Sequence, residues 1–313
     1  MGEPKWHIVI SEGFGRAAIA RAQAVARVTV LTTSDEPALK KAVRDCDALL
    51  VRTSATVTRD VIEQAGRLRV IGRAGSGLDN IDVEAARERG ILVIHTPDAA
   101  TSAVADLTLG LMIALVRRIT TCDAAVRADR FAEERSQYET PELSELTLGI
   151  VGLGRIGKAV ARRCYHGFAM RILYNDILDA QPFDFEATPT DKAQLFRQAD
   201  VVSLHLPLTE QTRRLIDGEA LAQFKRGSFL INTARGAVVD SAALAHALES
   251  GQLAGAALDV FDPEPLPKGH PLLTAPHTLF TPHVGARSRT GLTRMNAVVD
   301  EVIRTLEESR AVS

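Results

Sequence analysis

Three short segments of this 313-residue chain hold side chains that could move a proton and bind a carboxylate. Each directly follows an apolar run typical of a buried strand, and the three are NTARG (232–236), DVFDPEP (259–265) and TPHVG (281–285). In an open parallel sheet, ligands bind outside the carboxyl ends of the strands. We therefore expect Arg235, Glu264 and His283, one from each segment, to converge on one site.

A glycine-rich turn precedes these segments, in the sequence VGLGRIG (151–157) between a predicted strand and a predicted helix. Gly152 permits the tight turn, Gly154 lets a pyrophosphate approach the backbone, and Gly157 lets the helix pack on the strand. The helix N-terminus would direct N–H groups and a positive dipole end toward the phosphates. The alternative is a tight strand–helix turn that binds nothing.

Asp176 favours the dinucleotide interpretation because it ends a second predicted strand, 19 residues after Gly157. A carboxylate at that place accepts hydrogen bonds from a ribose 2′-hydroxyl, although a solvated loop acid is the alternative. The carboxylate would repel a 2′-phosphate, and Ile177 and Leu178 bring no compensating cation. The sequence therefore predicts NAD rather than NADP.

The residue types suit hydride transfer between a dinucleotide and a 2-hydroxy acid. Histidine exchanges protons near neutral pH, and Glu264 would favour the imidazolium and orient the ring. Arg235 could grip a carboxylate with two N–H groups and polarise the carbonyl. Taken singly, each residue is as readily a strand-end histidine, a loop glutamate or a surface arginine. Behind a dinucleotide motif, the set favours catalysis.

Short apolar runs alternate with helical patterns along the chain, which predicts two series of parallel βαβ units. The predicted strands are His7–Ile10, Val28–Leu31, Ala48–Val51, Val70–Gly72, Leu92–Ile94, Leu148–Val151, Arg171–Tyr174, Val201–Leu204, Phe229–Ile231, Ala256–Leu258 and Thr278–Phe280. Helices are expected at Pro37–Arg44, Arg59–Ala65 and Val83–Arg89, with one long helix from Ala99 to Arg130 and a final helix from Arg287 to Glu308. The polar segment Arg130–Leu146 is expected to be a linker.

Composition excludes several classes of protein. The hydrophobic fraction of 46% suits folded cores, and a net charge of −2 gives no electrostatic footprint for nucleic acid. The three cysteines form no CxxC pair, so we expect neither a metal site nor disulfides. The most apolar stretch, Leu107–Val116, is about half the length of a membrane span. We expect a cytoplasmic protein with a small-molecule partner and no nucleic-acid or membrane partner.

From about Leu49 to about Gly285 the chain resembles the D-isomer-specific 2-hydroxyacid dehydrogenase family, because GLGRIG, LHLPLT, NTARG, LDVFDPEP and TPHVG occur in that order. The resemblance implies that Arg235 anchors the substrate, Glu264 partners the histidine, and His283 is the general acid/base. Glu264 also argues against formate dehydrogenases of this superfamily, which place a glutamine there. Further cofactor contacts implied by the resemblance are His205, Pro207, Thr233, Asp259 and Gly285, with the backbone N–H groups of Arg155 and Ile156.

The family fold would give two α/β domains, Rossmann-like and flavodoxin-like, with parallel sheets and an inter-domain cleft. The resemblance implies a substrate domain of residues 1–98 with 284–313 and an NAD-binding domain of residues 99–283. It also implies a homodimer. The printed chain ends at Ser313, so feedback inhibition by serine through an appended domain is not expected.

Within the family, RAGSGLDNID (73–82) and LVRTSA (50–55) resemble the phosphoglycerate dehydrogenase branch. That likeness implies substrate carboxylate binding by the Ser76-Gly77 backbone. Arg52 and Arg73 would supply positive charge to a phosphate, with Arg135 as a contributor across a dimer contact. A solvated strand-end cation is an equally weighted alternative for Arg52.

Other segments depart from that branch. TPDAATS (96–102) and VAD (104–106) are more similar to hydroxypyruvate and glyoxylate reductases, and Arg287 and Thr290 replace the usual small residue and acid. The leading hypothesis is oxidation of 3-phosphoglycerate to 3-phosphohydroxypyruvate in serine synthesis, with neutral His283 taking the hydroxyl proton. One alternative is a hydroxypyruvate or glyoxylate reductase. Another is a dinucleotide-sensing binding protein similar to corepressors of this fold, which keep the catalytic residues and usually add a disordered tail.

Overall fold

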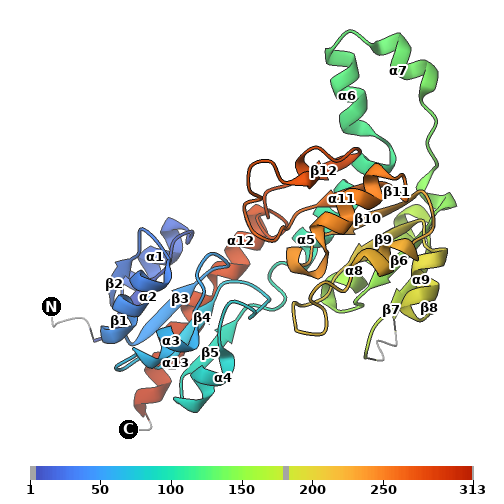
Figure 1. The fold of residues 1–313 in the computed structure, drawn as a ribbon. Coiled ribbons are helices and arrows are strands. Elements are labelled where there is room, and N and C mark those ends of the chain that lie inside the picture. Colours follow the sequence, from blue (N-terminus) through green and yellow to red (C-terminus); the bar gives the residue numbers. More distant parts are fainter. Residues whose placement is uncertain (1–4, 179–182, 312–313) are drawn as a thin grey trace. The chain divides into compact units, whose positions relative to one another are not determined.

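The computed structural model describes residues 5–178 and 183–311. The chain folds into two compact units, the first made of Met1–Ala100 with Ala286–Ser313 and the second of Thr101–Gly285 (Figure 1). Each unit contains one parallel sheet with helices packed against it, so the predicted pair of parallel-sheet α/β folds is confirmed. The assignment of residues 1–98 and 284–313 to substrate binding, and of residues 99–283 to NAD binding, stays a prediction.

The first unit has a five-stranded parallel sheet with the strand order β2-β1-β3-β4-β5. Its strands are β1 (His7–Ile10), β2 (Arg27–Val30), β3 (Ala48–Val51), β4 (Val70–Arg73) and β5 (Leu92–His95). Its helices are α1 (Arg16–Gln23), α2 (Glu36–Ala42), α3 (Arg59–Glu63), α4 (Val83–Glu88), α12 (Arg289–Asn296) and α13 (Val298–Ala311), with the 3-10 turn η1 (Val43–Asp45).

Alternate residues of the central strands of this sheet meet helices on opposite faces. Leu49 and Ile71 belong to the core shared with α2, α3 and α4. Gly72 faces α13 instead, where a Cβ would come within 2.6 Å of both Leu50 and Val302 side-chain atoms. A glycine at this position therefore lets the C-terminal helix pack closely on β4.

The second unit has a seven-stranded parallel sheet with the strand order β12-β11-β10-β9-β6-β7-β8. Its strands are β6 (Thr147–Val151), β7 (Arg171–Asn175), β8 (Thr188–Pro189), β9 (Val201–Leu204), β10 (Ser228–Asn232), β11 (Leu253–Leu258) and β12 (Thr278–Phe280). Its helices are α5 (Thr101–Val116), α6 (Ile119–Arg127), α7 (Phe131–Gln137), α8 (Arg155–Phe168), α9 (Lys192–Gln198), α10 (Gly218–Ala222) and α11 (Ser241–Glu249), with the 3-10 turns η2 (Leu143–Glu145), η3 (Gly236–Val238) and η4 (Pro271–Leu273).

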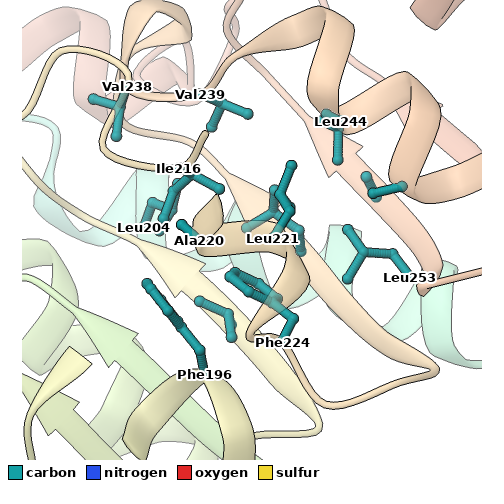
Figure 2. Packing of buried hydrophobic residues seen from close by; sticks show 14 of the residues in the cluster. Phe196, Leu204, Ile216, Ala220, Leu221, Phe224, Val238, Val239, Leu244 and Leu253 are labelled. Carbon is teal, nitrogen blue, oxygen red and sulfur yellow. The ribbon is translucent and has the colours of Figure 1, made fainter. Parts of the chain in front are cut away.

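A large apolar core lies between this sheet and helices α9, α10 and α11 (Figure 2). Phe196 of α9 stacks on Phe224, which follows α10, with ring centroids 4.6 Å apart. Leu204 and Leu253 extend the cluster from the sheet. Burial of such side chains contributes about 1.5–3 kcal/mol each, so this core fixes the strands whose carboxyl ends carry the polar segments.

The long helix expected from Ala99 to Arg130 is wrong, because the chain forms two helices there. Helix α5 ends at Val116, and the next helix begins at Ile119 after Arg118, whose backbone is left-handed with φ 49°. The two segments have different surroundings, since α5 packs against α8 and the sheet whereas α6 and α7 project from the body of the second unit in Figure 1. The hydrophobic pattern of the sequence could not predict this break, because it carries no signal for one arginine with a left-handed backbone.

Two further expectations are corrected. The segment expected to be a linker, Arg130–Leu146, contains helix α7, and the expected final helix is interrupted at Ala297 between α12 and α13. The short edge strand β8 carries too little pattern to be predicted.

Within residues 5–178 and 183–311, no helix is long and apolar enough to cross a membrane. In the same residues, no three His, Cys, Asp or Glu side chains are placed to hold a metal ion.

Candidate active site

His283 and Glu264 form a hydrogen-bonded pair at the carboxyl end of the second unit's sheet. His283 Nδ1 lies 2.7 Å from Glu264 Oε2, and about a third of each side chain is exposed. The second oxygen of Glu264, Oε1, accepts a 2.8 Å hydrogen bond from the backbone N–H of Phe261. With Nδ1 engaged by the carboxylate, Nε2 is the ring nitrogen that remains to exchange a proton with a substrate.

The surroundings of Glu264 keep it ionised. Partial burial raises the pKa of this carboxyl, but the hydrogen bonds from His283 and Phe261 and the charges of His283 and Arg235 lower it more. The net pKa lies below the usual value for glutamate. Glu264 is therefore a carboxylate at neutral pH, and the Arg235 guanidinium is close enough to contribute to its charge state.

Asp259 holds the loop that carries His283. Its side chain is 1% exposed, and Oδ1 accepts hydrogen bonds from Thr281 Oγ1 at 2.6 Å and from the N–H of Val284 at 2.9 Å. Oδ2 accepts from the N–H of Gly285 at 2.8 Å. The N–H of His283 donates to the backbone oxygen of Asp259 at 2.8 Å. These contacts hold His283 in a left-handed backbone conformation with φ 51°, which L residues seldom adopt.

The segment that carries Arg235 is fixed by its neighbour Asn232. The amide of Asn232 donates to the Arg235 oxygen at 2.9 Å and accepts from the N–H of Ala234 at 3.0 Å. Arg235 Nη1 donates to the oxygen of Ala234 at 2.7 Å. A Cβ at Gly236 would overlap the backbone of Phe261, so only glycine lets this segment approach the one that ends in Glu264. The structure therefore brings Arg235, Glu264 and His283 together, as predicted.

The His283–Glu264 pair borders a cavity of about 540 Å³ within the second unit. The other lining residues are mostly apolar: Phe261, Pro265, Leu266, Leu273, Phe280, Thr281 and Pro282. A lining of this kind lowers the local dielectric and strengthens the electrostatic coupling of the pair.

The glycine-rich turn between β6 and α8 has the geometry that a dinucleotide needs. Gly152 is left-handed with φ 92°, and a Cβ there would come within 2.7 Å of the His205 oxygen. A Cβ at Gly157 would overlap the oxygen of Gly152. A Cβ at Gly154 would have no described atom within 4 Å, and among the described residues no side chain caps α8. The turn thus leaves space and N–H groups at the start of α8, beside Arg155 and Ile156.

Asp176 and His205 flank this turn. Asp176 Oδ2 accepts from the N–H of Leu153 at 2.6 Å, and Oδ1 accepts from the N–H of Leu178 at 2.9 Å. His205 Nε2 lies 2.9 Å from Ser203 Oγ, whereas its buried Nδ1 has no hydrogen-bond partner in the described part of the chain. Burial lowers the pKa of His205 to about 3, so the ring is neutral. An unpartnered ring nitrogen beside the turn is what a bound ligand would complete.

The remaining cofactor candidates lie at the same edge of the sheet. Strands β6 and β9 are neighbours at the point where the strand order reverses, the place where doubly wound sheets bind ligands. Pro207 follows β9 and is exposed. Thr233 follows β10, is buried, and pairs its hydroxyl with that of Thr108 at 2.9 Å. Gly285 is tied to Asp259, and a Cβ there would come within 3.0 Å of Oδ2.

These features fit the family comparison. Residues 109–285 match the model of the D-isomer specific 2-hydroxyacid dehydrogenase, NAD binding domain. The chain belongs to this family. It is therefore an NAD-dependent oxidoreductase of the D-2-hydroxyacid dehydrogenases, which confirms the predicted family, reaction class and cofactor.

Relatives of this dehydrogenase carry different substrate names. D-3-phosphoglycerate dehydrogenase of Methanocaldococcus jannaschii is 40% identical over 301 residues, which are 95% of this chain and 56% of that protein. Glyoxylate reductase of Thermofilum pendens is 42% identical over 264 residues, covering 82% of this chain and 77% of that protein. The TT0316 protein from Thermus thermophilus is similar in structure, with a TM-score of 0.88, 40% identity and coverage of 96% and 97% of the two chains.

The residues expected to select the substrate of this dehydrogenase belong to its first unit. Arg52 directly follows β3 and is partly buried, and its Nη1 donates to the Gly13 oxygen at 3.0 Å. Arg73 ends β4 and is only 5% exposed. Its guanidinium donates to the Ala74 oxygen at 3.1 Å and to Thr53 Oγ1 at 3.2 Å. Ser76 and Gly77 lie partly exposed in the following loop.

Sequence reasoning missed several positioning residues of the dehydrogenase. Asn80 is buried and donates to the oxygens of Arg52 and Ala55, which ties the loop after β3 to the glycine-containing loop. Thr281 and Gly236 lay inside recognised motifs, but their roles depend on contacts with distant segments. Thr108 sits within an apolar helix, where no sequence signal marks its bond to Thr233.

Proposed function

We propose that this dehydrogenase oxidises D-3-phosphoglycerate to 3-phosphohydroxypyruvate with NAD, the first step of serine synthesis. The carrying observation is Arg52, a partly buried guanidinium that has no carboxylate partner among the described residues. Leaving a cation partly desolvated and unpaired costs free energy, which a bound anion would offset. A phosphate ester supplies that anion, whereas glyoxylate carries only the carboxylate needed by the reaction.

In the proposed mechanism, each residue of the second unit has one task. Arg235 binds the substrate carboxylate with its forked N–H groups. Neutral His283 takes the proton of the C2 hydroxyl onto Nε2, because Glu264 engages Nδ1 and orients the ring. The imidazolium that forms is stabilised by the adjacent carboxylate. NAD, when bound, would accept the C2 hydrogen as a hydride.

The residues proposed to hold NAD are those of the β6–α8 turn and its neighbours. The N–H groups at the start of α8 would bind the pyrophosphate, and Asp176 would bind the ribose hydroxyls. The unpartnered Nδ1 of His205 and the open space above Gly154 support this placement.

Reduction of hydroxypyruvate or glyoxylate is the second candidate. The relative named glyoxylate reductase has the higher identity of the two reported and is matched over more of its own length. The segments TPDAATS (96–102) and VAD (104–106) also resemble the reductase branch. Both candidates use the same His283, Glu264 and Arg235, so only the substrate distinguishes them.

The deciding experiment compares substrates that differ by the phosphate alone. We expect kcat/KM for D-3-phosphoglycerate to exceed that for D-glycerate by about 100-fold, since a charged contact contributes about 1.5–3 kcal/mol. Arg52→Ala should raise the KM for D-3-phosphoglycerate at least tenfold. Arg87→Ala removes an exposed arginine of the same unit and should change neither KM.

Other outcomes favour the other hypotheses. Equal kcat/KM values with and without phosphate, together with fast reduction of glyoxylate or hydroxypyruvate, would favour the reductase. NAD binding without turnover of any 2-hydroxy acid would favour a dinucleotide-sensing binding protein. The panel is read at the nicotinamide absorbance band with NAD(H) and NADP(H).

A further inference from the structure

Two arginines of the first unit, Arg52 and Arg287, lie next to helix α12. Arg52 follows β3, next to the point where the strand order reverses between β1 and β3. Arg287 directly precedes Ser288, the N-cap of α12. Met295 of the same helix contacts Arg52, with its Sδ 3.9 Å from Nη2. The reversal point of an open α/β sheet is where such folds bind ligands.

The guanidinium of Arg52 is held in place without a counter-ion. The Gly13 oxygen accepts a hydrogen bond from Nη1, and the Phe14 ring lies below the guanidinium, 5.8 Å from centroid to Cζ. Burial, and then the charge of Arg287, lower the pKa of Arg52, so the two cations are close enough to repel.

No acidic side chain forms an ion pair with either arginine in the described part of the chain. Arg287 is exposed. Glu12, the acid of the loop after β1, is exposed and makes no such pair there either. The first turn of α12 contains no acid, so its dipole adds to the positive potential.

Arg73 differs from this pair. Its buried guanidinium is folded back onto Ala74 and Thr53, and a Cβ at Gly75 would overlap it. This geometry suits a residue that shapes the loop holding Ser76 and Gly77. The exposed Arg287 is better placed than Arg73 to meet a ligand from solvent.

We propose that Arg52 and Arg287 together form a subsite for a second anionic group of the substrate, which makes Arg287 a specificity-determining residue. This inference rests on the proposed function and names the residue that selects a phosphorylated 2-hydroxy acid. Along the chain, Arg287 comes four residues after His283. Two guanidinium forks match the oxygens of a phosphate dianion.

The test measures KM and kcat of Arg287→Ser with D-3-phosphoglycerate and D-glycerate. We expect the KM for D-3-phosphoglycerate to rise about 10- to 100-fold with kcat nearly constant, since one charged contact to the phosphate is lost. The KM for D-glycerate should change less than about twofold, and Arg287→Lys should be intermediate because it keeps charge without the fork. Arg289→Ser, an exposed arginine two residues along, is the matched control and should behave as the native chain.

Equal losses on both substrates, or an unchanged KM for D-3-phosphoglycerate, would overturn the subsite. If the native enzyme prefers D-3-phosphoglycerate but Arg287→Ser keeps that preference, the proposed function stands and the subsite falls. If the native enzyme does not prefer D-3-phosphoglycerate, the proposed function fails, and D-malate against D-lactate then tests the subsite with a second carboxylate. A preference for D-malate that Arg287→Ser abolishes would support it, and its absence would overturn it.

Discussion

The functional side chains at the carboxyl ends of the two sheets differ in how fully the protein satisfies their hydrogen bonds and charges. In the second unit, Asp259 accepts from Thr281, Val284 and Gly285, and Glu264 accepts from His283 and Phe261. In the first unit, Arg52 donates to one backbone oxygen and contacts a methionine sulfur, and the charge of Arg287 lowers its pKa.

This contrast separates reaction from selection. The groups that we propose to transfer the proton, His283 and Glu264, are oriented by hydrogen bonds within the second unit, which is what catalysis by preorganised groups requires. In our proposal, Arg52 and Arg287 of the first unit are neutralised by an anionic group of the substrate. One reaction can thus serve several substrates when residues outside the hydrogen-bonded set change.

The largest expected effect comes from replacing His283, the proposed proton acceptor at the carboxyl end of the second unit's sheet. His283→Asn should lower kcat about 1,000-fold on the best substrate, because the proton acceptor is lost. Asparagine is chosen because it tolerates the left-handed backbone at this position. His277→Asn is the matched control, since His277 is also left-handed, with φ 55°, and should keep full activity. Steady-state rates that fall less than tenfold in His283→Asn would remove His283 from the chemistry.

The second effect tests whether Asp259 organises the His283 loop or only contacts the cofactor. Asp259→Ala leaves buried donors without an acceptor and should lower the free energy of unfolding by about 3 kcal/mol. Thr281→Val removes one of these bonds and should cost about 1 kcal/mol. Urea unfolding measures both. Native stability combined with a large rise in the Kd for NADH would instead mark Asp259 as a cofactor ligand alone.

The sequence predicted those parts that depend on pattern and motif. Short apolar runs located every described strand of both sheets except β8, and the motifs located His283, Glu264 and Arg235. The break at Arg118 was missed because a left-handed arginine has no sequence signature. The folding of Arg73 onto Ala74 and the neighbourhood of Arg52 and Arg287 were also out of reach. The contacts of Arg73 with Thr53 and of Arg52 with Met295 join segments that are distant in the sequence and meet only in the folded unit.

A third, smaller effect concerns the cofactor end of the second unit, where Asp176 is hydrogen-bonded through both oxygens but remains partly exposed. Its charge should repel a 2′-phosphate, so kcat/KM should be higher with NAD than with NADP. Asp176→Ser should lower the ratio of kcat/KM with NAD to kcat/KM with NADP about 10- to 100-fold, mainly because NAD binds more weakly. Asp184→Ser, on an exposed carboxylate paired with Arg162, is the control. A native enzyme that uses NADP better than NAD would contradict this account of Asp176.

The smallest effect tests whether the His283–Glu264 pair stabilises the fold as well as orienting the ring. The pKa of Glu264 is lowered in the folded chain, so its ionised form stabilises the fold above the unfolded-state pKa of about 4.3. That contribution is lost as pH falls through the lower, folded-state pKa. Because the side chain is about a third exposed, the gap in unfolding free energy between the native chain and Glu264→Gln should stay under about 1 kcal/mol at pH 7. In urea titrations the gap should shrink below pH 4. A difference in unfolding free energy that widens on acidification would mean that the pKa of Glu264 is raised. The expected small difference, together with a kcat that falls at least tenfold in Glu264→Gln, would show that the pair orients the ring rather than stabilises the fold.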